Sequence, residues 1–273
     1  NLGMVYTPKP PCFMLKCCNE IFELSQFCVG VGKIGVECFD TNRAPIMLFA
    51  TFVTFICMLL TIIALVAVSD IDSYIKDTCW TYGEVSDGSK IYVGLNKIII
   101  SEPNAPDQSI VWGDSACHTL EQAGNDLGFC EECRTECDAA VGVAIVSLIT
   151  IIPTITTDIQ RSTRRGDMNC QKFMGILTGV LGFVSTLAAL STYAGGCYHN
   201  LPTEYNGVRI NYSLGPGFLC LLVATVLKII DVVANVFLPV VPYTEPALKE
   251  SLVGSQSMTK SDSDATPTSI HGV

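Results

Sequence analysis

The chain has 273 residues, of which only 15% are charged, and its mean hydropathy is +0.43. This composition is too apolar for an ordinary soluble domain of that length. The formal net charge of −10 also argues against nucleic acid as a partner, because a phosphate backbone would be repelled. An integral membrane protein is therefore predicted.

Residues 1–45 are predicted to form a cytoplasmic segment at the membrane interface. Between residues 13 and 27, apolar and charged side chains alternate as in a short helix lying on a bilayer. Cys17 and Cys18 within this stretch are candidates for S-palmitoylation. Residues 30–35 match the glycine pattern of dinucleotide-binding loops, but they precede a membrane span rather than a βαβ unit. No cofactor is expected from this match.

Four long apolar segments follow, at residues 46–69, 139–157, 173–194 and 214–236. A helix of about 20 residues crosses a hydrocarbon core of about 30 Å, because it rises about 1.5 Å per residue. The apolar runs are continuous, whereas the strands of a membrane barrel alternate in polarity. The predicted fold class is an all-α membrane protein, in which a four-helix bundle lies within a domain at residues 46–240.

Residues 70–138, between the first two spans, are predicted to be the larger external loop. They include 14 acidic and four basic side chains, so the loop has a net charge of −10. Their first half is rich in β-branched and aromatic residues around the turn signal Asp87-Gly88, which is typical of a small antiparallel sheet. Residues 118–138 have a helical pattern that leads into the second span.

Residues 195–213 are predicted to be the second external loop. A strand is expected at residues 207–212, where it can join the sheet of the first loop. Asn211 begins an Asn-Tyr-Ser sequon and is a candidate N-glycan acceptor, although it lies close to the fourth span. Residues 241–273 are rich in Ser, Thr, Asp and Pro and are predicted to be a disordered cytoplasmic tail.

Positive charge predicts the orientation of the bundle. Arg161, Arg164 and Arg165 lie in the short connection between the second and third spans, whereas the second external loop contains only Arg209. Short loops rich in Lys and Arg face the cytoplasm. Both termini are therefore expected inside the cell, with the two loops exposed at the plasma membrane.

Six cysteines fall on the predicted outer side, where oxidising conditions favour three disulfides, with 15 possible connectivities. They are Cys79, Cys117, Cys130, Cys133, Cys137 and Cys197. Three of them recur on one helical face at i, i+3 and i+7. That spacing also suits zinc, but the external location favours disulfides, so no metal is expected.

Two features of the spans have more than one interpretation. Gly175, Gly179 and Gly182 give the third span a face of small residues, for packing inside the bundle or against a partner subunit. Lys228 and Asp231 can pair in the fourth span. Counting from the start of that span puts Lys228 near the cytoplasmic boundary, where snorkelling accounts for its charge, and a transport role is the alternative.

The pair Cys79-Trp80 at the start of a large first loop, and Gly94-Leu95 on a later strand, resemble the claudin-like superfamily. That superfamily includes claudins, peripheral myelin protein, calcium-channel gamma subunits and amastin-type surface proteins. The sequence departs from the claudin pattern at Asn96, where claudins have a tryptophan. Tetraspanins fit less well, because they place their large loop between the third and fourth spans. The resemblance implies four spans below an external sheet stapled by disulfides.

No pattern of catalytic residues is apparent, and only three histidines occur, so an enzyme is not expected. Trp80, Tyr92, Gly94 and Leu95 are expected to form the part of the sheet that packs toward the membrane and meets a partner. We expect a tetraspan protein that acts in assembly, adhesion or scaffolding through its external loops. The partners would be membrane lipid and another membrane protein. Alternatives are an auxiliary subunit of an ion channel, suggested by the gamma subunits, and an oligomeric cation pore.

Overall fold

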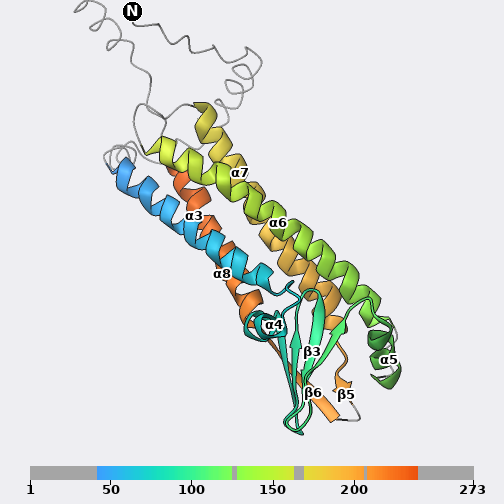
Figure 1. Ribbon diagram of the computed structural model, residues 1–273. Helices are drawn as coiled ribbons and strands as arrows, with labels where there is room; N and C mark the ends of the chain where they lie inside the picture. Colours follow the sequence, from blue (N-terminus) through green and yellow to red (C-terminus); the bar gives the residue numbers. More distant parts are fainter. Residues whose placement is uncertain (1–41, 125–127, 163–168, 206–207, 239–273) are drawn as a thin grey trace, which may run out of the picture. The chain divides into compact units, whose positions relative to one another are not determined.

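A computed structural model describes residues 42–124, 128–162, 169–205 and 208–238. Four helices in this part of the chain are long and apolar enough to cross a membrane. They are α3 (Arg43–Val66), α6 (Phe129–Arg161), α7 (Asn169–Thr192) and α8 (Pro216–Phe237). A π-helical turn, η2 (Tyr193–Cys197), and a 3₁₀ turn, η3 (Tyr198–Asn200), extend α7. The chain is therefore an integral membrane protein with four spans (Figure 1).

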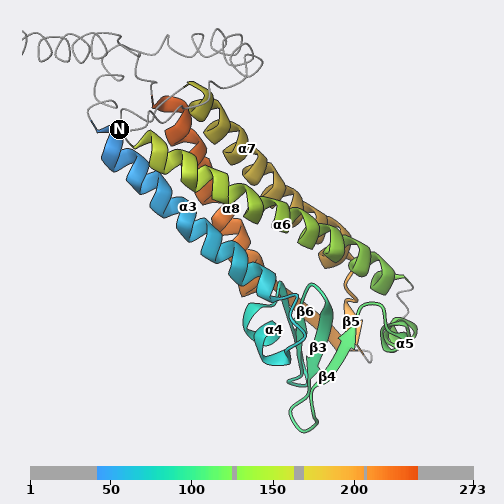
Figure 2. The same ribbon diagram turned by 45° about the horizontal axis from the view of Figure 1, so that its top comes forward.

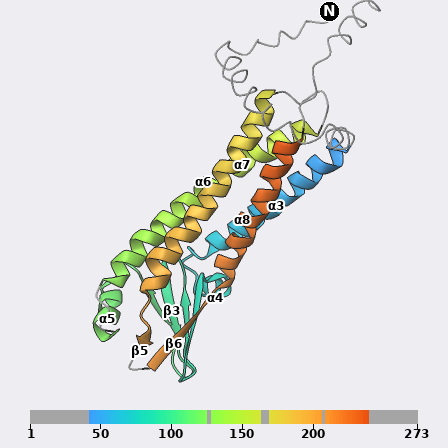
Figure 3. The same ribbon diagram turned by 180° about the vertical axis from the view of Figure 1, so that it is seen from behind.

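The four helices form a bundle in which α3 contacts α8 and α6, while α7 contacts α6 and α8. Figure 3 shows α7 beside α6, and α8 beside α3. Large apolar side chains cover the outside of the bundle; Phe52 is 60% exposed and Ile152 is 66% exposed. Such a surface is stable in lipid, where apolar side chains gain nothing by turning inward.

Helix α6 has 33 residues and begins at Phe129, ten positions before the apolar run at residues 139–157. At about 1.5 Å per residue its length is about 50 Å, which exceeds the hydrocarbon thickness of about 30 Å. Its first turns share a hydrophobic core with the strands of the sheet, because Cys130 and Cys133 pack in the same cluster as Ile91 and Ile98. The helical pattern predicted at residues 118–138 is present in two pieces, α5 (Ser115–Gly124) and the start of α6.

Both external loops contribute to one six-stranded antiparallel sheet of order β4-β3-β2-β1-β6-β5. The strands are β1 (Thr81–Val85), β2 (Lys90–Val93), β3 (Lys97–Ser101), β4 (Gln108–Val111), β5 (Glu204–Tyr205) and β6 (Val208–Leu214). Strand β6 from the second loop pairs with β1 from the first, which confirms that the predicted strand joins the sheet. Strands β4 and β5 were not predicted.

The centre of the sheet depends on a glycine beside a tyrosine. Gly83 lies opposite Tyr212, and a Cβ on Gly83 would lie 2.8 Å from the Tyr212 ring. The ring therefore fills the space that a side chain at Gly83 would need, and β1 and β6 pack closely. The β1–β2 turn contains Gly88 at φ +90°, a conformation that favours glycine.

Two short helices flank the sheet. Helix α4 (Asp72–Thr78) contacts β2 and β3, while α5 contacts β4 and β5. Figure 2 shows α4 and α5 on opposite sides of the sheet. We call the sheet with α4, α5 and the first turns of α6 the external module. The largest hydrophobic core of the described chain joins the inner side of this module to the adjoining ends of the helices.

Candidate functional site: the external module and its attachment to the bundle

Trp80 fixes the external module to the bundle. Its side chain is 0% exposed, and its indole Nε1–H donates a hydrogen bond to the Ala64 carbonyl near the end of α3, at 2.9 Å. Its ring meets Tyr193 and Phe218 edge-on, with centroid distances of 4.9 and 5.8 Å. Trp80, which directly precedes β1, therefore links the sheet to α3, η2 and α8. Because its side chain is buried, it offers no surface to a partner.

Gly94 and Leu95 dock the β2–β3 turn on the outer end of α3. The Leu95 amide donates to the Ala67 carbonyl at 3.1 Å, and the Leu95 side chain is 2% exposed. A Cβ on Gly94 would lie 2.9 Å from the same carbonyl oxygen, so glycine permits this contact. The structure thus places these two predicted partner-surface residues in the interior, together with Trp80. Tyr92 is half-buried and lies on the opposite side of the sheet.

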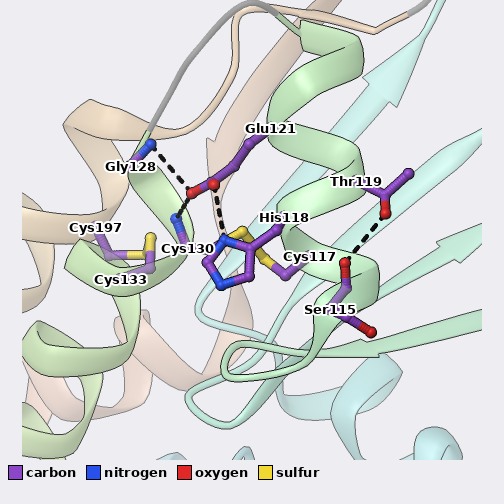
Figure 4. Close-up of a disulfide and its surroundings, with 9 residues drawn as sticks. All are labelled: Ser115, Cys117, His118, Thr119, Glu121, Gly128, Cys130, Cys133 and Cys197. Carbon is purple, nitrogen blue, oxygen red and sulfur yellow. Dashed lines mark hydrogen bonds and ion pairs between the residues drawn. A yellow bond between two sulfur atoms is a disulfide. The ribbon is translucent and has the colours of Figure 1, made fainter.

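Two disulfides are present in the external module, Cys117–Cys130 and Cys133–Cys197 (Figure 4). The first joins α5 to the start of α6, and the second joins α6 to η2 in the second loop. The prediction of three disulfides was wrong, because Cys79 and Cys137 are free thiols with exposed fractions of 1% and 0%. Burial raises the pKa of the Cys79 thiol to about 11, which disfavours the reactive thiolate.

Glu121 holds the junction between α5 and α6 beside the first disulfide. Its carboxylate accepts hydrogen bonds from the Cys130 amide at 2.7 Å, the Gly128 amide at 3.2 Å and His118 Nδ1 at 3.0 Å (Figure 4). Burial opposes ionisation of this carboxyl, but the bonds from His118 and the two amides outweigh it and hold the Glu121 pKa below its ordinary value. Glu121 also provides acceptors for backbone amides at the start of α6, which have no partner within the helix. Helices α5 and α6 are therefore joined both by these hydrogen bonds and by the Cys117–Cys130 disulfide.

The solvent-facing side of the sheet presents an aromatic pair next to a polar groove. Tyr82 and Tyr92 are directly paired across β1 and β2, with ring centroids 5.4 Å apart, and Lys76 Nζ lies 5.8 Å from the Tyr92 centroid. A groove of about 500 Å³ adjoins Tyr82. It is lined by Tyr82, Glu84, Val85, Ser86, Gly88, Asn211, Tyr212 and Ser213. We call Tyr82, Tyr92 and this groove the outer face.

Asn211, the predicted glycan acceptor, lies opposite Glu84 on the outer face, and its side chain is exposed. Strand β6 ends at Leu214 and α8 begins at Pro216, so Asn211 is five positions from the fourth membrane helix. An extended chain covers at most about 3.6 Å per residue, so the side chain lies within about 18 Å of that helix. The position is accessible but close to the membrane.

The three glycines of α7 face the interior of the bundle. A Cβ on Gly175 would lie 2.9 Å from Asn235 Oδ1, and one on Gly182 would lie 2.7 Å from Thr150 Oγ1 and 3.1 Å from Lys228 Nζ. A Cβ on Gly179 would lie 3.0 Å from Val232. This confirms the interpretation that the small-residue face packs inside the bundle, where it makes room for polar side chains of α6 and α8.

Lys228 does not snorkel, and that prediction was wrong. The side chain is 6% exposed, and Nζ donates to Ser147 Oγ on α6 and, at 3.2 Å, to the Gly182 carbonyl on α7. These bonds, rather than a direct pair with Asp231, satisfy the ammonium group. Lys228, Asp231 and Asn235 recur at i, i+3 and i+7, so they share the inward face of α8. That spacing was the signal in the sequence that could have revealed their direction.

Several predicted features lie outside the described residues. These are most of the interfacial segment predicted at residues 1–45, with the palmitoylation candidates Cys17 and Cys18, and the tail predicted at residues 241–273. Arg164 and Arg165 of the basic connection also lie outside the described residues. They remain predictions.

No protein-family model matches the chain, and no curated protein is significantly similar to it in sequence. The functional interpretation therefore depends on the geometry described above.

Proposed function

We propose that this membrane protein is a non-enzymatic scaffold whose outer face binds a second membrane protein, either another copy or a different chain. The observation that carries the proposal is the fusion of both external loops into one body. Pairing of β1 with β6 and the Cys133–Cys197 disulfide join the loops, and Trp80 attaches them to the bundle. Such a module holds a binding surface at a fixed orientation to the membrane, which lowers the entropy lost on assembly.

The outer face has the composition of an interaction surface. Tyrosine is enriched at protein interfaces because it offers a large apolar ring and a hydrogen-bonding hydroxyl. Tyr82 and Tyr92 form such a pair beside the groove that contains Asn211. A glycan on Asn211 would occupy this groove, so we expect glycosylation and partner binding to compete there.

Disulfides also support the proposed orientation at the plasma membrane. Both lie near the amino end of α6, whereas Arg161 is at its other end. Disulfides persist in oxidising compartments, and basic residues favour the cytoplasmic side. We therefore propose that the external module lies outside the cell and the arginine-rich connection inside.

We keep the resemblance to the claudin-like superfamily as part of the proposal. The residues that carry it, Trp80 and the pair Gly94-Leu95, attach the sheet to the end of α3. Trp80 and Leu95 donate hydrogen bonds to backbone carbonyls there. The same resemblance suggested an auxiliary channel subunit, but one argument for that role was a glycine face free to meet a partner. That face packs within the bundle, so the scaffold is the better supported function.

The proposal is tested by affinity capture of the full chain after cross-linking in its native membrane and extraction in mild detergent. The wild type is compared with the double variant Tyr82→Ala/Tyr92→Ala, and with Tyr198→Ala as the matched control. Tyr198 is a half-buried external tyrosine away from this pair. Purified copies in facing vesicles test self-binding in parallel.

We expect wild type and Tyr198→Ala to recover one membrane partner in fixed stoichiometry, or to bind their own copies, while the double variant loses that binding at unchanged folding. Equal binding by the double variant would exclude the outer face as the binding surface. A wild type that stays monomeric and without a stoichiometric partner in both assays would refute the scaffold.

A further inference from the structure

Two carboxyl groups meet inside the bundle, on facing helices. Asp158 of α6 is 0% exposed and Asp231 of α8 is 3% exposed. Asn235 Nδ2 donates to Asp158 Oδ1 at 3.0 Å and to Asp231 Oδ1 at 3.2 Å. Because one nitrogen atom, Asn235 Nδ2, bonds both carboxyl groups, the two acids are close neighbours across α6 and α8. One amide and two acids therefore form a compact cluster.

Two cations near the acid pair donate hydrogen bonds to neutral oxygens. Arg161 Nη1 donates to Asn235 Oδ1 at 2.6 Å and to the Asn235 carbonyl, and Nη2 donates to the Leu238 carbonyl. Lys228 donates to Ser147 and to the Gly182 carbonyl. Asp158 Oδ2 is buried and accepts no hydrogen bond. That oxygen is the unsatisfied atom of the cluster.

Each helix around the acid pair contributes a defined neighbour. From α3, Thr54 lines the same small cavity as Asp231, and Cys57 lies one helical turn further along the same buried face. From α7, a Cβ on Gly179 would lie 3.4 Å from Asp231 Oδ2. Among the described residues, the charged and titratable groups around the pair are Arg161, Lys228 and Cys57.

Two buried carboxylates that accept from the same amide nitrogen cannot both remain ionised in a medium of low dielectric constant, because their repulsion is poorly screened. We propose that Asp158 and Asp231 form a proton-binding site that holds one proton between them. The proton comes from water and adds to one carboxylate, so an O–H forms that donates to the other carboxylate. This bond satisfies Asp158 Oδ2 and joins α6 to α8.

The position of the pair indicates the side from which the proton comes. Asp158 is in the last turn of α6, and Asp231 lies six residues before Phe237 at the end of α8. At about 1.5 Å per residue, Asp231 is about 9 Å from that end of its helix. The site thus exchanges protons with the solution opposite the external module, and loss of the proton leaves repulsion between α6 and α8.

The site is tested by infrared spectroscopy of the full chain in lipid nanodiscs at neutral pH, where a buried carboxylic acid gives a carbonyl band that shifts in D₂O. We compare the wild type with Asp158→Asn and Asp231→Asn. Asp138→Asn is the matched control, because Asp138 is an exposed acid on the same helix as Asp158. We expect the band in wild type and in the control, and its loss in both other variants.

Thermal unfolding against pH gives a second readout. A proton held more tightly by the folded chain stabilises it at low pH, so wild-type stability should fall as the pH rises through the pKa of the pair. In Asp158→Asn, an amide N–H replaces the proton as a permanent donor to Asp231, and the dependence should disappear.

Absence of the band from folded wild type at neutral pH would overturn the proposal, as would a band that survives both substitutions. Stabilisation by sodium ions without a protonated acid would also overturn it and would indicate a cation site instead. Because the assay does not involve the outer face, its result is independent of the scaffold hypothesis.

Discussion

The external module has an apolar interior of Ile91, Ile100 and Ile210, whereas the bundle is lined by polar residues such as Ser147 and Thr154. Water surrounds the module, so burying apolar side chains stabilises it. Lipid surrounds the bundle and solvates apolar side chains as well as its interior does, so close contacts and hydrogen bonds must hold the helices together. Each region therefore buries the side chains that its surroundings solvate poorly. The module buries apolar side chains away from water, and the bundle buries polar side chains away from lipid.

The largest test of this contrast is removal of the Trp80 side chain. Replacing a buried tryptophan by alanine typically costs about 3–5 kcal/mol. Trp80→Ala should therefore separate the module from the bundle, and lower the thermal stability measured in detergent by about that amount. Trp80→Phe keeps a ring without the donor to Ala64 and should lose less. Equal losses would mean that the ring contributes nothing beyond its hydrogen bond.

Next in size is the effect of the two disulfides. The bridged cysteines are 64 residues apart in Cys133–Cys197 and 13 apart in Cys117–Cys130. Loop-closure entropy predicts losses of about 4 and about 3 kcal/mol when each pair is replaced by serine. The free energy of unfolding in denaturant measures both. A larger loss for the shorter loop would contradict the idea that the long link between the two loops stabilises the module more.

Within the bundle, Gly182→Ala should destabilise by about 1–3 kcal/mol, because the added methyl meets Thr150 and Lys228. The control is Gly142→Ala on α6, where a Cβ would meet nothing within 4 Å. That variant should be stabilised by about 0.5–1 kcal/mol through the gain in helix propensity. Thermal unfolding in detergent compares them, and equal stabilisation of both would show that the interior is not closely packed at Gly182.

The smallest effect concerns pH in the external module. Because the folded-state pKa of Glu121 is lowered, its contribution is complete above the unfolded-state pKa and is lost as the pH falls through the folded-state pKa. Hydrogen exchange at the α5–α6 junction should therefore accelerate in acid in the wild type. Glu121→Gln should exchange faster at neutral pH and show a weaker response. An identical acid response in both chains would assign the effect to another group.

The sequence was sufficient for the spans, because continuous apolar length is a local property. It also predicted a helix at residues 118–138 that leads into the second span, but not the division of this stretch into α5 and the start of α6. Strand β4 is only four residues long and is defined by pairing with β3, which no local pattern reveals. The direction of Lys228 was missed because distance along a helix gives depth but not the side on which a residue lies.

The candidate site was less predictable. Four of the six cysteines predicted to be external form the two disulfides, but which of them pair and which stay free depends on how η2 meets α6 in three dimensions. Trp80, Gly94 and Leu95 were selected for their resemblance to a family motif, and burial gives them a structural role. Tyr82 was not selected, because its pairing with Tyr92 follows from strand register.

The central claim, that two external loops form one body fixed to the bundle, is tested most directly by disulfide mapping. The full chain is alkylated in denaturant without reductant, digested, and analysed by mass spectrometry. The structure predicts peptides linked through Cys117–Cys130 and Cys133–Cys197, with Cys79 and Cys137 alkylated. A Cys197 that is free, or bridged to a cysteine other than Cys133, would contradict this account of how the loops are joined.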